Sequence, residues 1–184
     1  MHLKGPVAAG MFLLVLLAAA HAHAGEPASS DLKPWAVTAG AGYGQIFGVS
    51  DVNSSSSQTF ETPALSLELA HRFGTGHQVA ARGDYVNAIR MPESYIDVLA
   101  TQVSLTYGYV VGLGRFQFDA NGGVSVGMKV VAQSDVIGYI PTLGLTGTIG
   151  ARYKPREFLG VGVDLIGATS ARTANAQVAV EFSF

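Results

Sequence analysis

Residues 99–109 read LATQVSLTYGY and alternate between two kinds of side chain. Every second position from Leu99 to Tyr109 carries a larger, mostly apolar side chain, and the positions between them are small or polar. Because successive side chains of a β-strand point to opposite faces, this period of two predicts a strand with one apolar and one polar face. Segments of about 10 residues with this alternation are typical of strands that cross a membrane in a β-barrel.

Seven further segments show the same alternation. They lie at residues 35–44, 64–73, 78–85, 116–130, 139–153, 159–165 and 176–184. Eight alternating segments, an even number, predict an all-β fold, namely an eight-stranded antiparallel up-and-down transmembrane β-barrel.

The connections between these segments alternate in length. Tight turns are predicted at residues 74–77, 112–115 and 154–157, and longer polar loops at residues 46–61, 88–97, 131–138 and 167–175. Short periplasmic turns and longer outer loops are typical of bacterial barrels, so we expect the tight turns to lie in the periplasm.

The composition also favours a membrane protein. Hydrophobic residues make up 48% of the 184 residues and charged residues only 13%, whereas a globular protein carries about 25% charged residues. A soluble barrel with its apolar face inward is the alternative, but so few charges would leave its surface poorly solvated. Cysteine is absent, which excludes a disulfide scaffold and a cysteine-ligated zinc site. A net charge of −2 gives no basic excess with which to bind nucleic acid.

The N-terminus has the pattern of an export signal. Lys4 precedes an apolar stretch from Gly5 to Ala20, and Ala22-His23-Ala24 fits a signal-peptidase site. We therefore expect residues 1–24 to be a cleaved signal peptide, residues 25–34 a short periplasmic segment and residues 35–184 the barrel. No apolar stretch of 18 or more residues follows Ala24, so the sequence predicts no further membrane helix and favours strands that cross the membrane.

The last residues carry a family resemblance. Val178, Val180, Phe182 and Phe184 are apolar or aromatic at alternate positions, and the sequence ends in Phe. This pattern resembles the terminal signature of bacterial outer-membrane β-barrel proteins. In size and strand number the chain resembles the small members of that class: outer membrane protein X, the opacity proteins and the barrel domain of outer membrane protein A. The resemblance implies a monomer in the cell outer membrane of a Gram-negative bacterium, in contact with lipid and lipopolysaccharide and assembled by the barrel-assembly machinery.

The polar face carries the charged residues of the predicted strands. Five are acidic and four are basic, and they are Glu68, Arg72, Arg82, Asp84, Asp119, Lys129, Arg152, Asp164 and Glu181. The first tight turn is expected to place Glu68 opposite Arg82, and the last hairpin to bring Asp164 near Gln177. The interior of an eight-stranded barrel is just wide enough for side chains to fill it.

Two functions remain open at this point. Paired interior charges favour a closed barrel with a structural or surface-interaction role. Small residues on the polar face of segments 35–44 and 139–153 favour the alternative, a narrow porin-like channel or facilitator for ions or small solutes. The polar, Ser-rich loop at residues 48–59 leaves an extracellular ligand of the outer loops as a further partner.

Catalysis is not expected. After the signal segment the sequence contains two histidines, His71 and His77, both near the first predicted tight turn. That turn lies on the side away from outer-leaflet lipid, and no acidic or histidine cluster has metal-ligand spacing. The sequence therefore predicts no enzyme, no metal and no cofactor.

Overall fold

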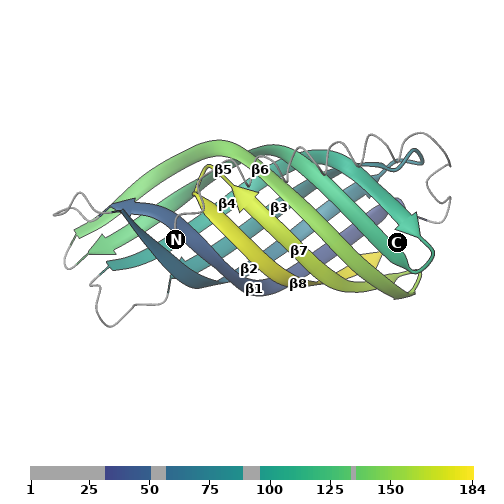
Figure 1. Cartoon of the computed structure of the whole chain (residues 1–184). Coiled ribbons are helices and arrows are strands. Elements are labelled where there is room, and N and C mark those ends of the chain that lie inside the picture. The colour runs from purple at the N-terminus through teal and green to yellow at the C-terminus, as the bar shows by residue number, and fades with distance from the viewer. Residues whose placement is uncertain (1–31, 51–56, 89–95, 134–135) are drawn as a thin grey trace.

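The computed structural model describes residues 32–50, 57–88, 96–133 and 136–184, which form eight strands (Figure 1). The strands are β1 (Trp35–Ser50), β2 (Ser57–Arg72), β3 (His77–Ala88), β4 (Ile96–Leu113), β5 (Phe116–Gln133), β6 (Val136–Arg156), β7 (Leu159–Ala168) and β8 (Thr173–Ser183). Each strand pairs antiparallel with the next, and β8 pairs with β1, so the sheet closes into a barrel. The predicted fold class is confirmed. The predicted signal peptide and residues 25–31 lie outside the described residues.

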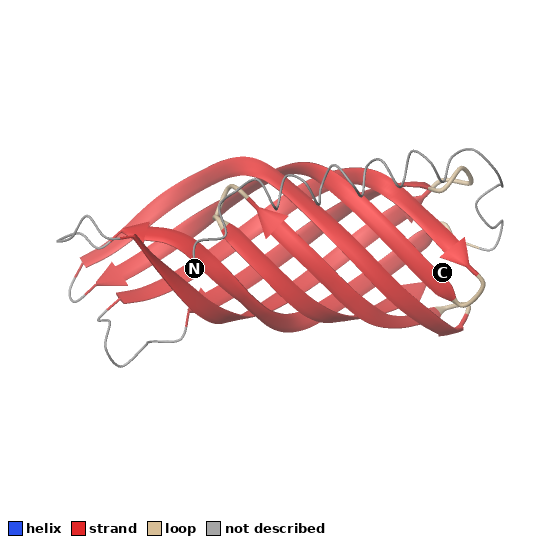
Figure 2. Cartoon of the chain, viewed as in Figure 1, coloured by secondary structure: helices blue, strands red, loops and turns tan. Residues whose placement is uncertain are grey.

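The whole described chain is strand, turn or extended segment, as Figure 2 shows. No helix within the described ranges is long and apolar enough to cross a membrane. We call the end with the turns at residues 73–76, 114–115 and 157–158 the periplasmic end and the opposite end the outer end, following the predicted topology.

The apolar face of every strand points outward. Leu67, Leu143 and Val178 are 60%, 77% and 61% exposed, whereas Thr38 and Gln177, which have the opposite phase, are buried. In a soluble barrel the apolar side chains would fill the interior instead. The soluble alternative is therefore wrong, and the outer surface suits a lipid environment.

The strands are longer than the sequence pattern predicted. The predicted loop at residues 46–61 is strand up to Ser50 and again from Ser57. Likewise, β5 and β6 take most of residues 131–138, and β6 runs through Arg156, beyond the start of the predicted turn at 154–157. Backbone pairing continues beyond the part of each strand that has an apolar outer face. There both faces of the strand contact water, so the side chains do not need to alternate between apolar and polar. The period of two therefore ends before the strand does.

The β7–β8 hairpin is formed by the two shortest strands of the barrel. β7 has 10 residues and β8 has 11, against 21 in β6, and in Figure 1 this hairpin turns well before the outer ends of β5 and β6. Its turn is anchored to β6 by a hydrogen bond of 2.8 Å from the Thr169 N–H to the Leu145 carbonyl. Ala171 in this turn is buried in an apolar cluster inside the barrel, which we call the outer apolar cluster. Its members are Ile46, Ala64, Val86, Val98, Ala100 and Ala171.

Aromatic side chains gather at the periplasmic end of the outer surface. Trp35, Phe73, Phe116, Tyr153 and Phe184 are all more than 40% exposed there. The Phe116 and Tyr153 rings lie 5.5 Å apart. Aromatic belts of this kind lie at the height of the lipid headgroups. This belt therefore marks the boundary of the membrane at the periplasmic end of the barrel.

Candidate functional site: the lumen network

The structure places all nine predicted interior charges inside the barrel, and none is more than 7% exposed. Eight of the nine join a connected set of ion pairs together with Lys154. We call this set the lumen network. Its members are Glu68, Arg72, Arg82, Asp84, Asp119, Arg152, Lys154, Asp164 and Glu181.

Arg152 on β6 is the centre of one half of the lumen network. Its Nη1 contacts the Asp119 carboxylate on β5, and its Nη2 donates to Asp164 Oδ1 at 2.8 Å and Oδ2 at 3.0 Å. Its Nε lies 3.4 Å from Glu181 Oε2. One guanidinium therefore joins carboxylates from three other strands, which the planar, five-donor geometry of arginine permits.

Arg82 on β3 is the centre of the other half. Its Nε donates to Asp84 Oδ1 at 2.9 Å, and its Nη1 lies 3.4 Å from Glu68 Oε2. The same Nη1 lies 3.7 Å from Asp164 Oδ2. The pairing of Glu68 with Arg82 follows from their position as direct neighbours on β2 and β3. Asp164 belongs to both halves and links them.

Glu181 on β8 gathers the cations at the periplasmic side. Arg72 Nη2 lies 2.7 Å from Glu181 Oε2, and Lys154 Nζ lies 3.2 Å from Oε1. Sequence reasoning missed Lys154 because it assigned residues 154–157 to a turn. The structure shows it on β6 instead, and the even-numbered phase it shares with Arg152 is the signal that could have identified it.

Amide and hydroxyl groups extend the lumen network, and sequence reasoning did not single them out. Ser66 Oγ donates to Gln177 Oε1, and Arg82 Nη2 donates to Ser66 Oγ at 2.8 Å. Gln177 can reach across β1 because Gly40 has no side chain: a Cβ there would lie 2.6 Å from Ser66 Oγ. Gln117 adds a bond of 3.0 Å from its Nε2 to Glu181 Oε2.

Lys129 is the predicted interior charge that stays outside the lumen network. It is buried on β5, nearer the outer end, and forms no ion pair with a carboxylate of the described chain. Its neighbours in the sheet are Ala100 and Ile140, neither of which has a charged group.

The predicted C-terminal residues lie on the outer surface of β8. Val178, Phe182 and Phe184 are 61%, 52% and 63% exposed, and Val180 is half-buried. The Phe184 N–H and carbonyl pair with Trp35 at 2.9 and 3.1 Å, next to the β1–β8 seam.

The histidines lie at the periplasmic end, away from the lumen network. The His71 ring lies 4.5 Å from the Trp35 ring, and His77 Nδ1 lies 2.7 Å from the Tyr107 hydroxyl. Within the described part of the chain, no three His, Asp or Glu side chains are grouped as metal ligands would be.

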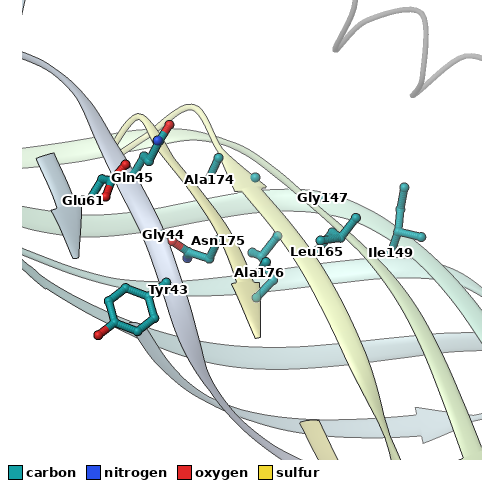
Figure 3. A pocket seen from close by; sticks show the side chains of 12 residues that line it. Tyr43, Gly44, Gln45, Glu61, Gly147, Ile149, Leu165, Ala174, Asn175 and Ala176 are labelled. Carbon is teal, nitrogen blue, oxygen red and sulfur yellow. The ribbon is translucent and has the colours of Figure 1, made fainter. Parts of the chain in front are cut away.

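A shallow groove of about 700 Å³ lies on the outer surface near the outer end, over β1, β2, β6, β7 and β8 (Figure 3). Small residues such as Gly147, Gly167 and Ala176 line it, together with the larger Tyr43. It belongs to the surface that faces lipid.

A closed, all-antiparallel barrel of eight strands with an apolar exterior and a charged interior defines a class: the small β-barrels of bacterial outer membranes. Solved structures of that class are similar to this chain. Neisserial surface protein A has a TM-score of 0.62 and 14% identity, over 86% of this chain and 100% of that one. Ail, the attachment invasion locus protein of Yersinia pestis, has a TM-score of 0.57 and 12% identity, over 83% and 100%. The N-terminal β-barrel domain of Pseudomonas aeruginosa OprF has a TM-score of 0.56 and 15% identity, over 83% and 99%.

These likenesses confirm the predicted resemblance at the level of the fold. No protein-family model matches the sequence, and no curated protein matches it. At 15% identity or less, the shared feature is the barrel architecture.

Proposed function

We propose that this chain is a small integral protein of the outer membrane with a structural or surface-interaction role and a closed lumen. The observation that carries the proposal is the lumen network, in which charged side chains from β2, β3, β5, β6, β7 and β8 meet inside the barrel. Five carboxylates and four cations bind one another there, so most of their charge is compensated inside the lumen without water.

The surface-interaction part of the role is assigned to the outer end. The strands β1, β2, β4, β5 and β6 extend beyond the β7–β8 turn, and exposed residues such as Glu61, Ile137 and Tyr139 lie on these extensions. One similar structure is Ail of Yersinia pestis in complex with the heparin analogue sucrose octasulfate. That example supports a ligand-binding role for a barrel of this kind.

The proposal includes the route to the membrane. Residues 1–24 act as the cleaved signal peptide, residues 25–34 stay in the periplasm, and residues 35–184 form the barrel. Val178, Val180, Phe182 and Phe184 are read by the barrel-assembly machinery. The inserted protein is a monomer surrounded by lipid and lipopolysaccharide, and it carries out no catalysis and binds no cofactor.

A narrow channel is the second candidate, and one observation favours it. Nearer the outer end, Thr173 Oγ1 and both polar side-chain atoms of Asn175 are buried with no hydrogen-bond partner in the described chain. Asn175 lies beside Gly44 of β1 in the sheet, and Thr173 lies beside Ile46. Unpaired polar atoms beside a glycine suit a short hydrated path from the outer end, and this path would have to pass the lumen network to cross the membrane.

Single-channel recording separates the two functions. The refolded, full-length protein is inserted into a planar bilayer, and insertion is verified by a heat-dependent gel shift of the same sample. Silence from inserted protein supports the closed barrel. Discrete, reproducible conductance steps would support the channel and make the lumen network its selectivity filter.

A further inference from the structure

A small pocket lies at the periplasmic end of the barrel, next to the lumen network, with which it shares Lys154. It has a volume of about 300 Å³ and is lined by Leu32, by residues of the β4–β5 turn and by residues 154–157 at the end of β6. The Lys154 N–H donates to the Arg115 carbonyl at 2.7 Å, which fixes the two chain segments side by side. The β4–β5 turn is tight because Gly114 adopts a φ of 61°, which glycine reaches without strain.

The charged residues that line the pocket are mostly cationic. They are Arg115, Lys154, Arg156 and Glu157. Lys154 is engaged by Glu181 in the lumen network. Glu157 lies 4.0 Å from Lys33, so its charge is partly offset by a cation that does not line the pocket. The remaining positive charge belongs to Arg115 and Arg156.

Neither of these two arginines forms an ion pair with a carboxylate of the described chain. Arg115 Nη1 donates to the Tyr153 hydroxyl at 3.3 Å, and the Arg156 guanidinium lies 5.9 Å from the centre of the Phe158 ring. These aromatic contacts leave most of the hydrogen-bond donors of both guanidinium groups without a protein partner in the described chain, since arginine has five.

The pocket opens at the height of the lipid headgroups. Phe116 lines it and is 54% exposed on the outer surface, where it contacts Tyr153 in the aromatic belt. Leu113 and Phe118, which are 63% and 45% exposed, extend this apolar surface beside the pocket. A lipid whose headgroup entered the pocket could therefore lay an acyl chain along these side chains.

We propose that this pocket binds the phosphate of an anionic phospholipid of the periplasmic leaflet, and that Arg115 and Arg156 donate hydrogen bonds to the phosphate oxygens. Guanidinium groups bind phosphate oxygens through two parallel hydrogen bonds, and the interface excludes part of the competing water. The lipid anchors the β4–β5 and β6–β7 turns to the membrane surface. The inference rests on the proposed membrane location and adds a lipid site to it.

The test compares lipid retention by native mass spectrometry of the full-length protein in detergent. Phosphatidylglycerol and phosphatidylcholine are supplied together. The wild-type protein should retain phosphatidylglycerol about tenfold more than phosphatidylcholine, because the choline cation of phosphatidylcholine offsets the phosphate charge and is repelled by the two guanidinium groups. The double variant Arg115→Gln/Arg156→Gln should lose this preference. Arg172→Gln is the matched control, since it removes an exposed cation from the β7–β8 turn at the other end of the barrel.

Three results would overturn the inference. They are equal retention of the two lipids by the wild-type protein, an undiminished preference in the double variant, and an equal loss in Arg172→Gln. A further arm adds inorganic phosphate: displacement of the lipid at a similar concentration would assign the pocket to a free anion instead. Flotation of the wild-type protein with vesicles is measured first, because a protein that fails to insert would contradict the proposed function and not the lipid site.

Discussion

The guanidinium of Arg82 on β3 lies 3.7 Å from the carboxylate of Asp164 on β7. In a closed barrel of eight sequentially paired strands, β3 and β7 are diametrically opposite. Their side chains therefore meet across the full width of the lumen. Because Asp164 also binds Arg152, and Arg82 also binds Glu68, this one contact joins the two halves of the lumen network.

Arg82→Ala should destabilise the barrel strongly. The substitution leaves Glu68 and Asp84 buried without their cation, and Asp164 with Arg152 alone. Removing one partner of a buried ion pair costs about 3–5 kcal/mol, because the remaining charge is desolvated and unpaired. Urea unfolding in lipid vesicles, followed by tryptophan fluorescence, measures the change in unfolding free energy.

Lys129→Met provides the matched control for that experiment. Lys129 is also a buried, lumen-facing cation, but it forms no ion pair with a described carboxylate. We expect its replacement to change the unfolding free energy by less than about 1 kcal/mol, or to raise it, because a buried unpaired charge is removed. Equal losses in Arg82→Ala and Lys129→Met would contradict the energetic role of the lumen network.

Gly42→Ala should be destabilising, although alanine within a strand is usually more stabilising than glycine. An added Cβ would lie 2.6 Å from Gln177 Cα and 2.9 Å from the Ala176 carbonyl carbon, and neither backbone atom can move without shifting β8. Overpacking of this kind costs about 1–3 kcal/mol. Gly122→Ala is the control, because nothing lies within 4 Å of its added Cβ. The prediction fails if both variants unfold at the wild-type urea concentration.

Val163→Arg tests the orientation of the sheet. Val163 is 49% exposed and lies in the middle of β7, a strand of only 10 residues. An arginine facing lipid near the bilayer centre costs about 2–4 kcal/mol. Val163→Leu keeps the residue apolar and should unfold like the wild type. The measurement is again vesicle-based unfolding, and tolerance of the arginine would argue that this face does not meet lipid.

Ile46→Ala tests the outer apolar cluster. Ile46 is completely buried inside the barrel, and truncating such a side chain to alanine costs about 2–5 kcal/mol because it leaves a cavity. Ile137→Ala is the matched change on the outer surface, where the side chain is 59% exposed. We expect the second variant to lose under about 1 kcal/mol. If the two losses were the same, the cluster would contribute nothing to stability.

Much of the lumen network followed from strand phase alone. Phase placed Glu68, Arg72 and Glu181 on the inner face, and hairpin register paired Glu68 with Arg82, because a tight turn fixes which residues face each other. Lys154 was missed because the alternation of apolar and polar residues does not continue to the end of β6, so residues 154–157 were assigned to a turn. The contacts of Arg152 with carboxylates on three other strands were also missed. They depend on the width of the closed barrel, which the sequence pattern does not give.

The amino-acid sequence determined the number of strands, their order and which face of each meets lipid. Alternation with a period of two encodes these features locally, and a shift of one residue would expose the whole polar face to the membrane. Tertiary structure decided the lengths of the strands at the outer end, the depth of the β7–β8 turn and the contact of Arg82 with Asp164. Those features depend on closure of the sheet, which brings together strands that are far apart in the sequence and sets the width that their side chains must span.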